Sequence, residues 1–248
     1  TTGVSEANRV AVSDGVVVQK GNIYGSYVWQ GQANDNAVTV SGSHVGSGNV
    51  IGGYTHDGSA SGNTVVMSDS TVGRHVTGGY VYDGATDGNV VTVSDSTVGE
   101  DITGGYVVLS GDASGNRVTI AGNTVVGGDI YGGYVEHQSG NGTQGDAKGN
   151  IVTLATGAGA DLSGSTVYGG RSNIAGADAV SGNVLNVDTS HVAVRNVVNF
   201  ERINLDFNTG VLPGAGNAVL SLNDAGGTDL RGTTINANGV LPGADRRW

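Results

Sequence analysis

Tyrosine recurs in this chain directly after a glycine-containing step, and side chains repeated at a fixed spacing are its best candidates for chemistry. The motif ends five times in tyrosine and once in arginine, at Tyr27, Tyr54, Tyr80, Tyr106, Tyr134 and Arg171. If successive motifs stack, the rings form a ladder that fixes their register, at roughly 0.5 to 1.5 kcal/mol per pair. The same strip could grip a sugar or a partner's extended strand. We therefore name as candidate binding residues Tyr54, Tyr80, Tyr106, Tyr134 and Arg171, and add Trp29, which we place in the first variable loop as a protruding contact.

Carboxylates recur in the same way and raise the question of catalysis. Asp69 and Asp95 occupy equivalent places in successive repeats, as do Asp57 and Asp83. Stacked backbones lie about 4.8 Å apart, close to the roughly 5 Å between the carboxyl groups of a retaining glycosidase. Repetition alone accounts for such pairs, and the serines lie in glycine-rich turns without a nucleophile elbow. We therefore predict no catalytic residues.

The residues that could bind a metal do not occur at the spacing of a known metal-binding motif. The five histidines, predicted to be exposed surface side chains, are His44, His56, His75, His137 and His191. Cysteine is absent, and Gly127-Gly128-Asp129 is a lone fragment of a calcium-binding nonapeptide. We predict no metal site and no cofactor, and leave open weak calcium binding in aspartate-bearing loops such as Asp83–Asp87.

The overall composition excludes several classes of protein. The 248 residues include 46 Gly, 2 Pro and no Cys, without the glycine period of collagen. The formal net charge of −11 argues against nucleic acid and anionic lipid as partners. No apolar stretch is long enough for a membrane helix. Hydrophobic residues make up 37% of the chain, and the valines recur in register, which argues against disorder.

Internal repeats supply the elements that would align these side chains. A Gly-Asn or similar turn precedes each repeat, with the asparagines at Asn8, Asn36, Asn63, Asn89, Asn116, Asn150 and Asn183. After each asparagine two apolar residues alternate with polar ones, as in Val38 and Val40 or Val65 and Met67. This period of two predicts a strand with one buried face.

Each repeat holds about three short strands separated by glycine corners, and one repeat cannot bury its own apolar face. Stacking the repeats buries that face. Connections between parallel strands are almost always right-handed, which favours a right-handed solenoid. The sequence therefore predicts an all-β, right-handed parallel β-helix of about seven coils, with a core of about 34 Å. Residues 1–190 form the repeats, and residues 191–248 form irregular capping coils of the same solenoid.

The segments after each tyrosine or arginine motif vary in sequence and length. They are Val28–Asp35, Thr55–Gly62, Val81–Gly88, Val107–Gly115, Val135–Gly149 and Arg171–Gly182. We predict loops that project from one flank of the rod, the flank that often carries binding in repeat proteins.

These motifs together resemble the secreted passenger domains of type V autotransporters of Gram-negative bacteria. The Gly-Asn-rich units, such as Ser61–Tyr80 and Gly88–Tyr106, resemble the coils of those passengers. The stretch Val197–Leu205 resembles the NFExINF segment that often follows the coils. The stretch from Asn217 to Leu230 resembles the DTxLTL…TDLSG sequence that comes next.

The resemblance implies an extracellular or surface-displayed β-helix that is threaded through an outer-membrane β-barrel translocator belonging to a longer precursor. Family passengers are typically cysteine-poor. Many are adhesins, whereas others carry protease or esterase domains; this chain shows no such appendage and is short for the family.

We therefore predict a non-catalytic adhesion or scaffold module at the cell surface, whose partner is a host or bacterial surface protein or glycan. Two alternatives stay open. One is a carbohydrate-active enzyme built on a β-helix. The other is a structural filament formed by end-to-end or lateral assembly of copies, for which unpaired edge strands provide a template.

Overall fold

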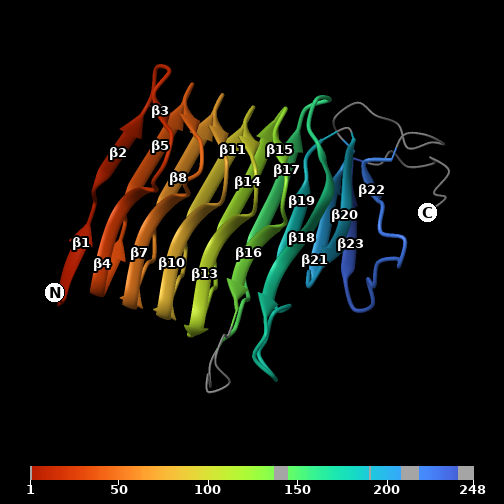
Figure 1. Ribbon diagram of the computed structural model, residues 1–248. Helices are drawn as coiled ribbons and strands as arrows, with labels where there is room; N and C mark the ends of the chain where they lie inside the picture. Colours follow the sequence, from red (N-terminus) through yellow and green to blue (C-terminus); the bar gives the residue numbers. More distant parts are fainter. Residues whose placement is uncertain (1, 137–144, 190, 208–217, 240–248) are drawn as a thin grey trace.

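The fold is a parallel β-solenoid of about seven turns, in a computed structural model that describes residues 2–136, 145–189, 191–207 and 218–239. Its strands lie side by side along a rod, with the N-terminal coil at one end and the C-terminal strands at the other (Figure 1). This confirms the predicted parallel β-helix. Among the described residues there is no helix with the length and apolarity to cross a membrane.

The described strands form three parallel sheets, each of which receives at most one strand per coil. Sheets A and B have nine strands each and run the length of the rod, whereas sheet C has five and ends at β15 (Val125–Val126). Sheet A contains β1 (Thr2–Glu6), β4 (Ile23–Asn34), β7 (Val50–Ser59), β10 (Val76–Ala85), β13 (Ile102–Ser110), β16 (Ile130–Val135), β18 (Leu162–Ser172), β20 (Val192–Val198) and β22 (Leu220–Leu222). Sheet B contains β2 (Arg9–Val12), β5 (Ala37–Ser41), β8 (Thr64–Ser68), β11 (Val90–Ser94), β14 (Arg117–Gly122), β17 (Ile151–Thr156), β19 (Val184–Val187), β21 (Arg202–Asp206) and β23 (Thr234–Asn238). Sheet C contains β3 (Val17–Val18), β6 (His44–Val45), β9 (Thr71–Val72), β12 (Thr97–Val98) and β15 (Val125–Val126).

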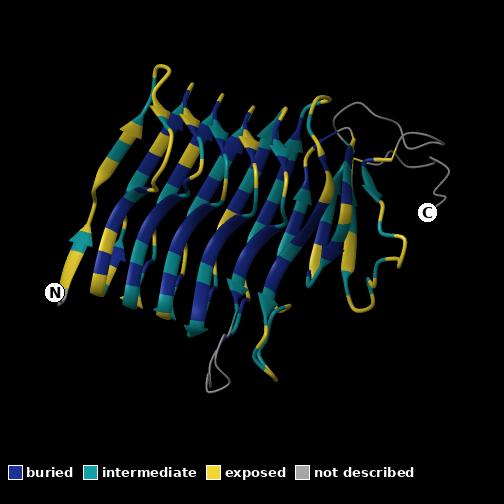
Figure 2. Cartoon of the chain, viewed as in Figure 1, coloured by how far each residue is buried: buried dark blue, intermediate teal, exposed yellow. Residues whose placement is uncertain are grey.

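The core is a set of columns in which equivalent apolar residues lie over one another. One coil contributes two residues from sheet B and one each from sheets C and A, for example Val38, Val40, Val45 and Val50, all fully buried. The predicted alternating pairs are the sheet B members of these columns. Buried residues follow the strands along the rod, and exposed ones gather at the corners (Figure 2). Mid-sized branched side chains fill this narrow space at high packing density.

A buried asparagine row runs beside the valine columns. Its fully or almost fully buried members are Asn36, Asn63, Asn89, Asn116, Asn150 and Asn183. The backbone N–H and the side-chain Nδ2 of Asn63 both donate to Oδ1 of Asn89, at 2.9 and 3.0 Å, and the same pair of bonds repeats along the row. The sequence marked these residues as turn elements. The structure shows that their amides also satisfy donors that would otherwise be buried without a partner.

The glycines of the tyrosine motif allow coils to approach closely. At Gly52, Gly104 and Gly132 an added Cβ would lie 2.4 Å from a backbone carbonyl oxygen of the next coil. The asparagine side chain of the same coil packs against the other side of each position. These positions require glycine because the backbone of the next coil and the asparagine side chain already occupy the space that a Cβ would need.

The prediction of projecting loops is wrong for the first part of each of the first four variable segments. The strands β4, β7, β10 and β13 continue into these segments, as far as Asn34, Ser59, Ala85 and Ser110. Within this extension Gln30, Asp57 and Asp83 pair in register. Backbone hydrogen bonds do not depend on side-chain identity, so sequences that differ can still share one ladder. Val28, Ala33, Ala60 and Val81 form a small second core inside this extension. In the segment Val135–Gly149, residues 137–144 lie outside the described residues.

The C-terminal part continues two of the three sheets. Strands β20 and β22 extend sheet A, and β21 and β23 extend sheet B, whereas the last described strand of sheet C is β15. Phe200 is buried in the main core and Phe207 packs against it. Residues 208–217, which include Asn217 of the resemblance, and 240–248 lie outside the described residues.

Candidate functional site

The predicted tyrosine ladder forms on the outer face of sheet A. Successive ring centroids of Tyr27, Tyr54, Tyr80, Tyr106 and Tyr134, here called the tyrosine row, lie 4.6, 5.1, 4.9 and 5.2 Å apart. The first two pairs are stacked, at 5° and 20° between ring planes, whereas the next two are tilted by 52° and 57°. The rings around Tyr106 therefore cover one another less completely than those at the N-terminal end.

Arg171 continues the tyrosine row instead of interrupting it. Its backbone pairs with Tyr134, and its guanidinium carbon lies 5.0 Å from the Tyr134 ring centroid and 5.5 Å from that of Tyr168. Its Nη1 donates to the hydroxyl of Tyr131 at 3.3 Å. A guanidinium over aromatic faces is a favourable cation–π arrangement. The arginine that breaks the sequence pattern thus preserves the stack.

Burial and nearby carboxylates keep the phenols of this face protonated. Burial, together with the neighbouring Tyr54 and Glu136, raises the pKa of Tyr80 to about 12. Burial also raises the pKa of Tyr106 well above its ordinary value, and the hydrogen bond that its hydroxyl donates to Glu136 adds to the rise. The pKa of Tyr131 is raised by burial and by Asp129 and Asp101. These hydroxyls are hydrogen-bond donors at neutral pH.

Alkaline unfolding tests this description. Because the pKa of Tyr80 in the folded chain exceeds its unfolded value of 10.0, its contribution to stability is complete below about pH 10. That contribution is lost as the pH rises through about 12. We expect the urea midpoint to fall over this interval, and to fall less steeply in Tyr80→Phe. The ultraviolet absorbance of tyrosinate, compared with that of the chain in concentrated urea, should show late ionisation in the folded protein only. Equal titration curves in the two states would contradict the assignment.

A groove lies beside the tyrosine row and crosses four coils. Its volume is about 440 Å³, and its floor is formed by Ile51, Thr77 and Thr103, which are register partners in β7, β10 and β13. Along each strand the order is corner residue, floor residue, two glycines and tyrosine, as in His75, Thr77 and Tyr80. The groove therefore runs along the rod axis, over about 14 Å for four coils.

Tyrosines replace the small floor residues on either side of the groove. The register partner of Thr103 in β16 is Tyr131, and that of Ile51 in β4 is Tyr24. The Tyr131 ring stacks between Tyr134 and Tyr168, at 4.9 and 4.8 Å between centroids. The groove exists because three consecutive positions of one outward column carry side chains smaller than tyrosine.

The opposite wall is a charged corner around His75. Its Nε2 lies 2.6 Å from Oε2 of Glu100, and its Nδ1 accepts a hydrogen bond from the backbone N–H of Asp101 at 3.2 Å. The same Nδ1 lies 3.5 Å from Oδ2 of Asp101, so two carboxylates face the imidazole. Arg74 Nε lies 3.5 Å from the same Glu100 carboxylate. His75 is half-buried, which corrects the prediction of an exposed side chain.

Trp29 lies in strand β4 and not in a loop, which corrects its predicted setting. The residue is 51% exposed, its ring stacks on His56 with 4.4 Å between centroids, and His56 stacks on Tyr82 at 4.6 Å. His56 Nδ1 also lies 2.8 Å from Oδ1 of Asp57, so this histidine too is more enclosed than predicted. Trp29 is not one of the described residues that line the groove.

The carboxylate pairs have structural roles at corners and along strands. Asp69 and Asp95 adopt positive φ angles of 49° and 48°, and the Asp95 carboxylate accepts the backbone N–H of Asn123 at 2.9 Å. Asp57 accepts from Gln30 at 3.3 Å, and Asp83 accepts from the Ser110 hydroxyl at 2.7 Å. Repetition of the coil explains each pair, as the sequence suggested.

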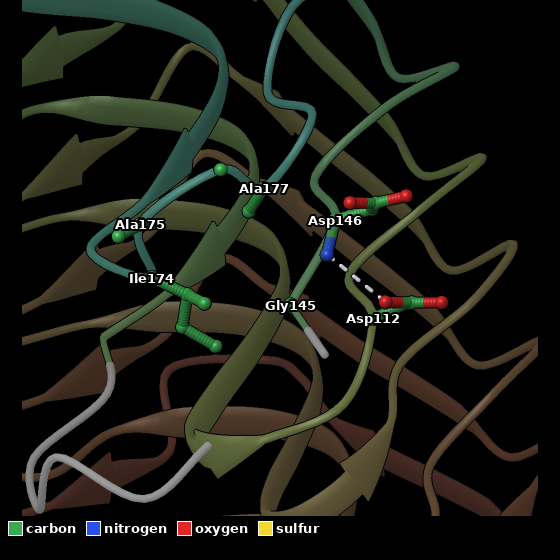
Figure 3. Close-up of a pocket in the computed structure, with 7 residues that line it drawn as sticks. Asp112, Gly145, Asp146, Ile174, Ala175 and Ala177 are labelled. Carbon is green, nitrogen blue, oxygen red and sulfur yellow. Dashed lines mark hydrogen bonds between the residues drawn. The ribbon is translucent and has the colours of Figure 1, made fainter. Parts of the chain in front are cut away.

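A second hollow of about 180 Å³ lies near Ile174, where the segment after β18 leaves the sheet (Figure 3). Asp112 and Asp146 border it, and the Asp112 carboxylate accepts the backbone N–H of Asp146 at 2.9 Å. Asp146 in turn accepts the N–H of Asp178 and pairs with Lys148 at 2.5 Å. These carboxylates hold successive turns together. No group of three or more His, Cys, Asp and Glu residues suited to a metal ion occurs among the described residues.

The structure therefore brings together only part of the predicted set. Tyr80, Tyr106 and Tyr134 line the groove. Tyr54 precedes Tyr80 in the same stack and Arg171 follows Tyr134, so these two flank the tyrosines that line the groove. Sequence reasoning missed the groove residues Thr77, Thr103, His75, Asp101 and Glu136. The available signal was the residue before each glycine pair, which changes from tyrosine to isoleucine or threonine and back.

The comparisons with known proteins add no name to this geometry. No protein-family model, curated protein or solved structure matches the chain. The class defined by the fold is a parallel β-solenoid with a tyrosine-walled groove, and the autotransporter resemblance remains a prediction from the sequence.

Proposed function

We propose that this chain is a non-catalytic adhesion scaffold of the bacterial cell surface, exported as an autotransporter passenger, and that the outer face of sheet A holds its target. The observation that carries the proposal is the groove of about 440 Å³, open beside protonated tyrosines on a stack of paired coils. A concave site with a few convergent polar groups is the usual form of a binding site.

The groove supports binding better than acid–base catalysis. Raised pKa values make Tyr80 and Tyr106 poor general bases at neutral pH. Glu136 accepts a hydrogen bond from Tyr106, and Asp101 accepts the backbone N–H of Asp129 at 2.8 Å. The fold therefore already uses both carboxylates as hydrogen-bond acceptors. The arrangement favours binding of a ligand over acid–base catalysis on it.

The sequence motifs support the cellular setting. The Val197–Leu205 stretch and the Gly-Asn coils resemble passenger sequences, and a chain without cysteine avoids disulfides that would obstruct threading. The proposed partners are an outer-membrane β-barrel translocator during export and a surface glycan or protein afterwards.

Attachment of beads coated with the purified protein to cell surfaces tests the proposal. In the double variant Tyr80→Phe with Tyr106→Phe the rings remain stacked but two hydroxyls on the groove wall are lost. We expect attachment to weaken about tenfold or more, since each lost hydrogen bond contributes on the order of 1 kcal/mol.

The matched control places the same kind of change on sheet B. Thr92 and Thr119 are register partners on the outer face of β11 and β14, so Thr92→Val with Thr119→Val removes two hydroxyls far from the groove. This control should attach like the wild type. No attachment by the wild-type protein would refute the adhesion function, and equal attachment by both double variants would refute the choice of face.

A further inference from the structure

The two threonines on the groove floor carry hydroxyls that the protein itself does not use. Thr77 and Thr103 are each only 5% exposed, and neither hydroxyl forms a hydrogen bond with another described residue. The oxygens that are both sealed and unpaired in the described chain belong to Ser26, Thr86 and Thr156, so those of Thr77 and Thr103 open to the groove. Buried polar groups normally have partners, and these two are directed to a space that a ligand can fill.

The groove carries charges of both signs. Asp101 and Glu136 line it together with Arg74 and His75, and Glu100 lies beside both Arg74 and His75. An anionic ligand would meet two carboxylates on a chain of net charge −11. A strongly cationic ligand would meet Arg74 at the wall, and the two lining carboxylates already accept hydrogen bonds from Tyr106 and from the backbone N–H of Asp129. A neutral ligand rich in hydroxyl groups avoids both penalties.

The backbone of this face has no free edge for a peptide strand. The strand β10 pairs with β7 on one side and β13 on the other, and β13 pairs with β16. Peptides that add a strand to a sheet need unpaired N–H and C=O groups. Recognition here depends on side-chain hydroxyls, carboxylates and aromatic edges.

We propose that the groove binds a neutral oligosaccharide that lies along the rod axis across β7, β10, β13 and β16. Thr77 and Thr103 contact it from the floor, the Tyr80 hydroxyl donates to it from one wall, and Asp101 accepts from its hydroxyls on the other. This inference rests on the proposed adhesion function and specifies the chemistry of its target.

Binding of soluble ligands to the full chain, measured by calorimetry and on a glycan array, tests the inference. The probes are neutral oligosaccharides, sialylated and sulfated ones, and a lysine-rich peptide. We expect binding of neutral oligosaccharides that changes little with salt. In Thr103→Val one hydroxyl is replaced by a methyl of similar size, and the affinity should fall about tenfold.

Thermal stability separates a ligand contact from a structural role. The Thr103 hydroxyl has no protein partner to lose, so Thr103→Val should melt at the wild-type temperature or above it. The control Thr119→Val, on the outer face of sheet B, should leave the affinity unchanged.

Three results would overturn the inference. The first is attachment to cells without binding of any neutral oligosaccharide, which would leave the adhesion function standing. The second is salt-sensitive binding of the peptide or of anionic glycans alone. The third is unchanged glycan affinity in both Thr103→Val and Thr77→Val, which would place the ligand elsewhere. Failure of the adhesion function itself would instead appear as absent attachment by the wild-type protein.

Discussion

Replacing Asn89 by alanine is expected to lower the free energy of unfolding by about 3 to 5 kcal/mol. Oδ1 of Asn89 accepts both the backbone N–H and the side-chain Nδ2 of Asn63, at 2.9 and 3.0 Å. Asn63 and Asn89 are both fully buried, so alanine leaves two donors without water or protein partners. Each orphaned donor costs about 1 to 3 kcal/mol. Urea unfolding followed by circular dichroism measures the loss.

A second asparagine row supplies the matched control. Asn204 donates to Asn186 at 2.8 Å and accepts from Asn236 at 2.8 Å, on the half-buried outer face of sheet B. Water can replace these bonds, so Asn204→Ala should cost less than about 1 kcal/mol. Similar losses in Asn89→Ala and Asn204→Ala would show that burial of the amide row is not what matters.

Replacing Gly78 by alanine is expected to prevent folding, or to cost more than about 4 kcal/mol. An added Cβ would lie 2.4 Å from the carbonyl oxygen of Gly104, 2.8 Å from Cβ of Asn89 and 3.2 Å from a methyl of Val91. The first contact is with backbone, which cannot rotate away. The distance between coils is held by backbone hydrogen bonds on both sides, so relief would require separating β10 from β13. Soluble expression and the thermal melting temperature measure the effect.

Gly164 is the corresponding control within the same sheet. It is exposed in β18, and an added Cβ would meet nothing within 4 Å. Gly164→Ala should therefore melt within a few degrees of the wild type, since alanine also restricts the unfolded chain. Normal folding of Gly78→Ala would mean that neighbouring coils can move apart more easily than their pairing indicates.

The repeat spacing predicted the stack because neighbouring copies solve the same burial problem with the same residues. Val38, Val65 and Val91 lie over one another because a period of two places each on the inner face of its strand. The tyrosine row follows from the same reasoning, since any residue at a constant offset from the valines must form a column. Adhesion, export and surface location are predictions of a different kind, drawn from resemblance.

Two expectations failed where the sequence varies and the backbone does not. The segments after Tyr54 and Tyr80 differ in side chains but remain paired as strands to Ser59 and Ala85, because the ladder uses only main-chain groups. Trp29 accordingly lies on a strand. His75 was expected to be an exposed side chain, yet it lies against Glu100 and Asp101 of the following coil and its side chain is 35% exposed. Neither contact has a signature in local sequence.

The sequence by itself determined the all-β solenoid, its columns and the aromatic row, because these depend on one repeated unit and on hydrophobic periodicity. Only the tertiary structure decided where a ligand could bind. The groove depends on a difference between coils, with Thr77 and Thr103 at positions that Tyr131 fills in the next coil. It depends equally on corner residues that meet only when one turn lies on another. The groove floor and its charged corner belong to no single repeat. Their residues meet only because successive coils lie one strand spacing apart.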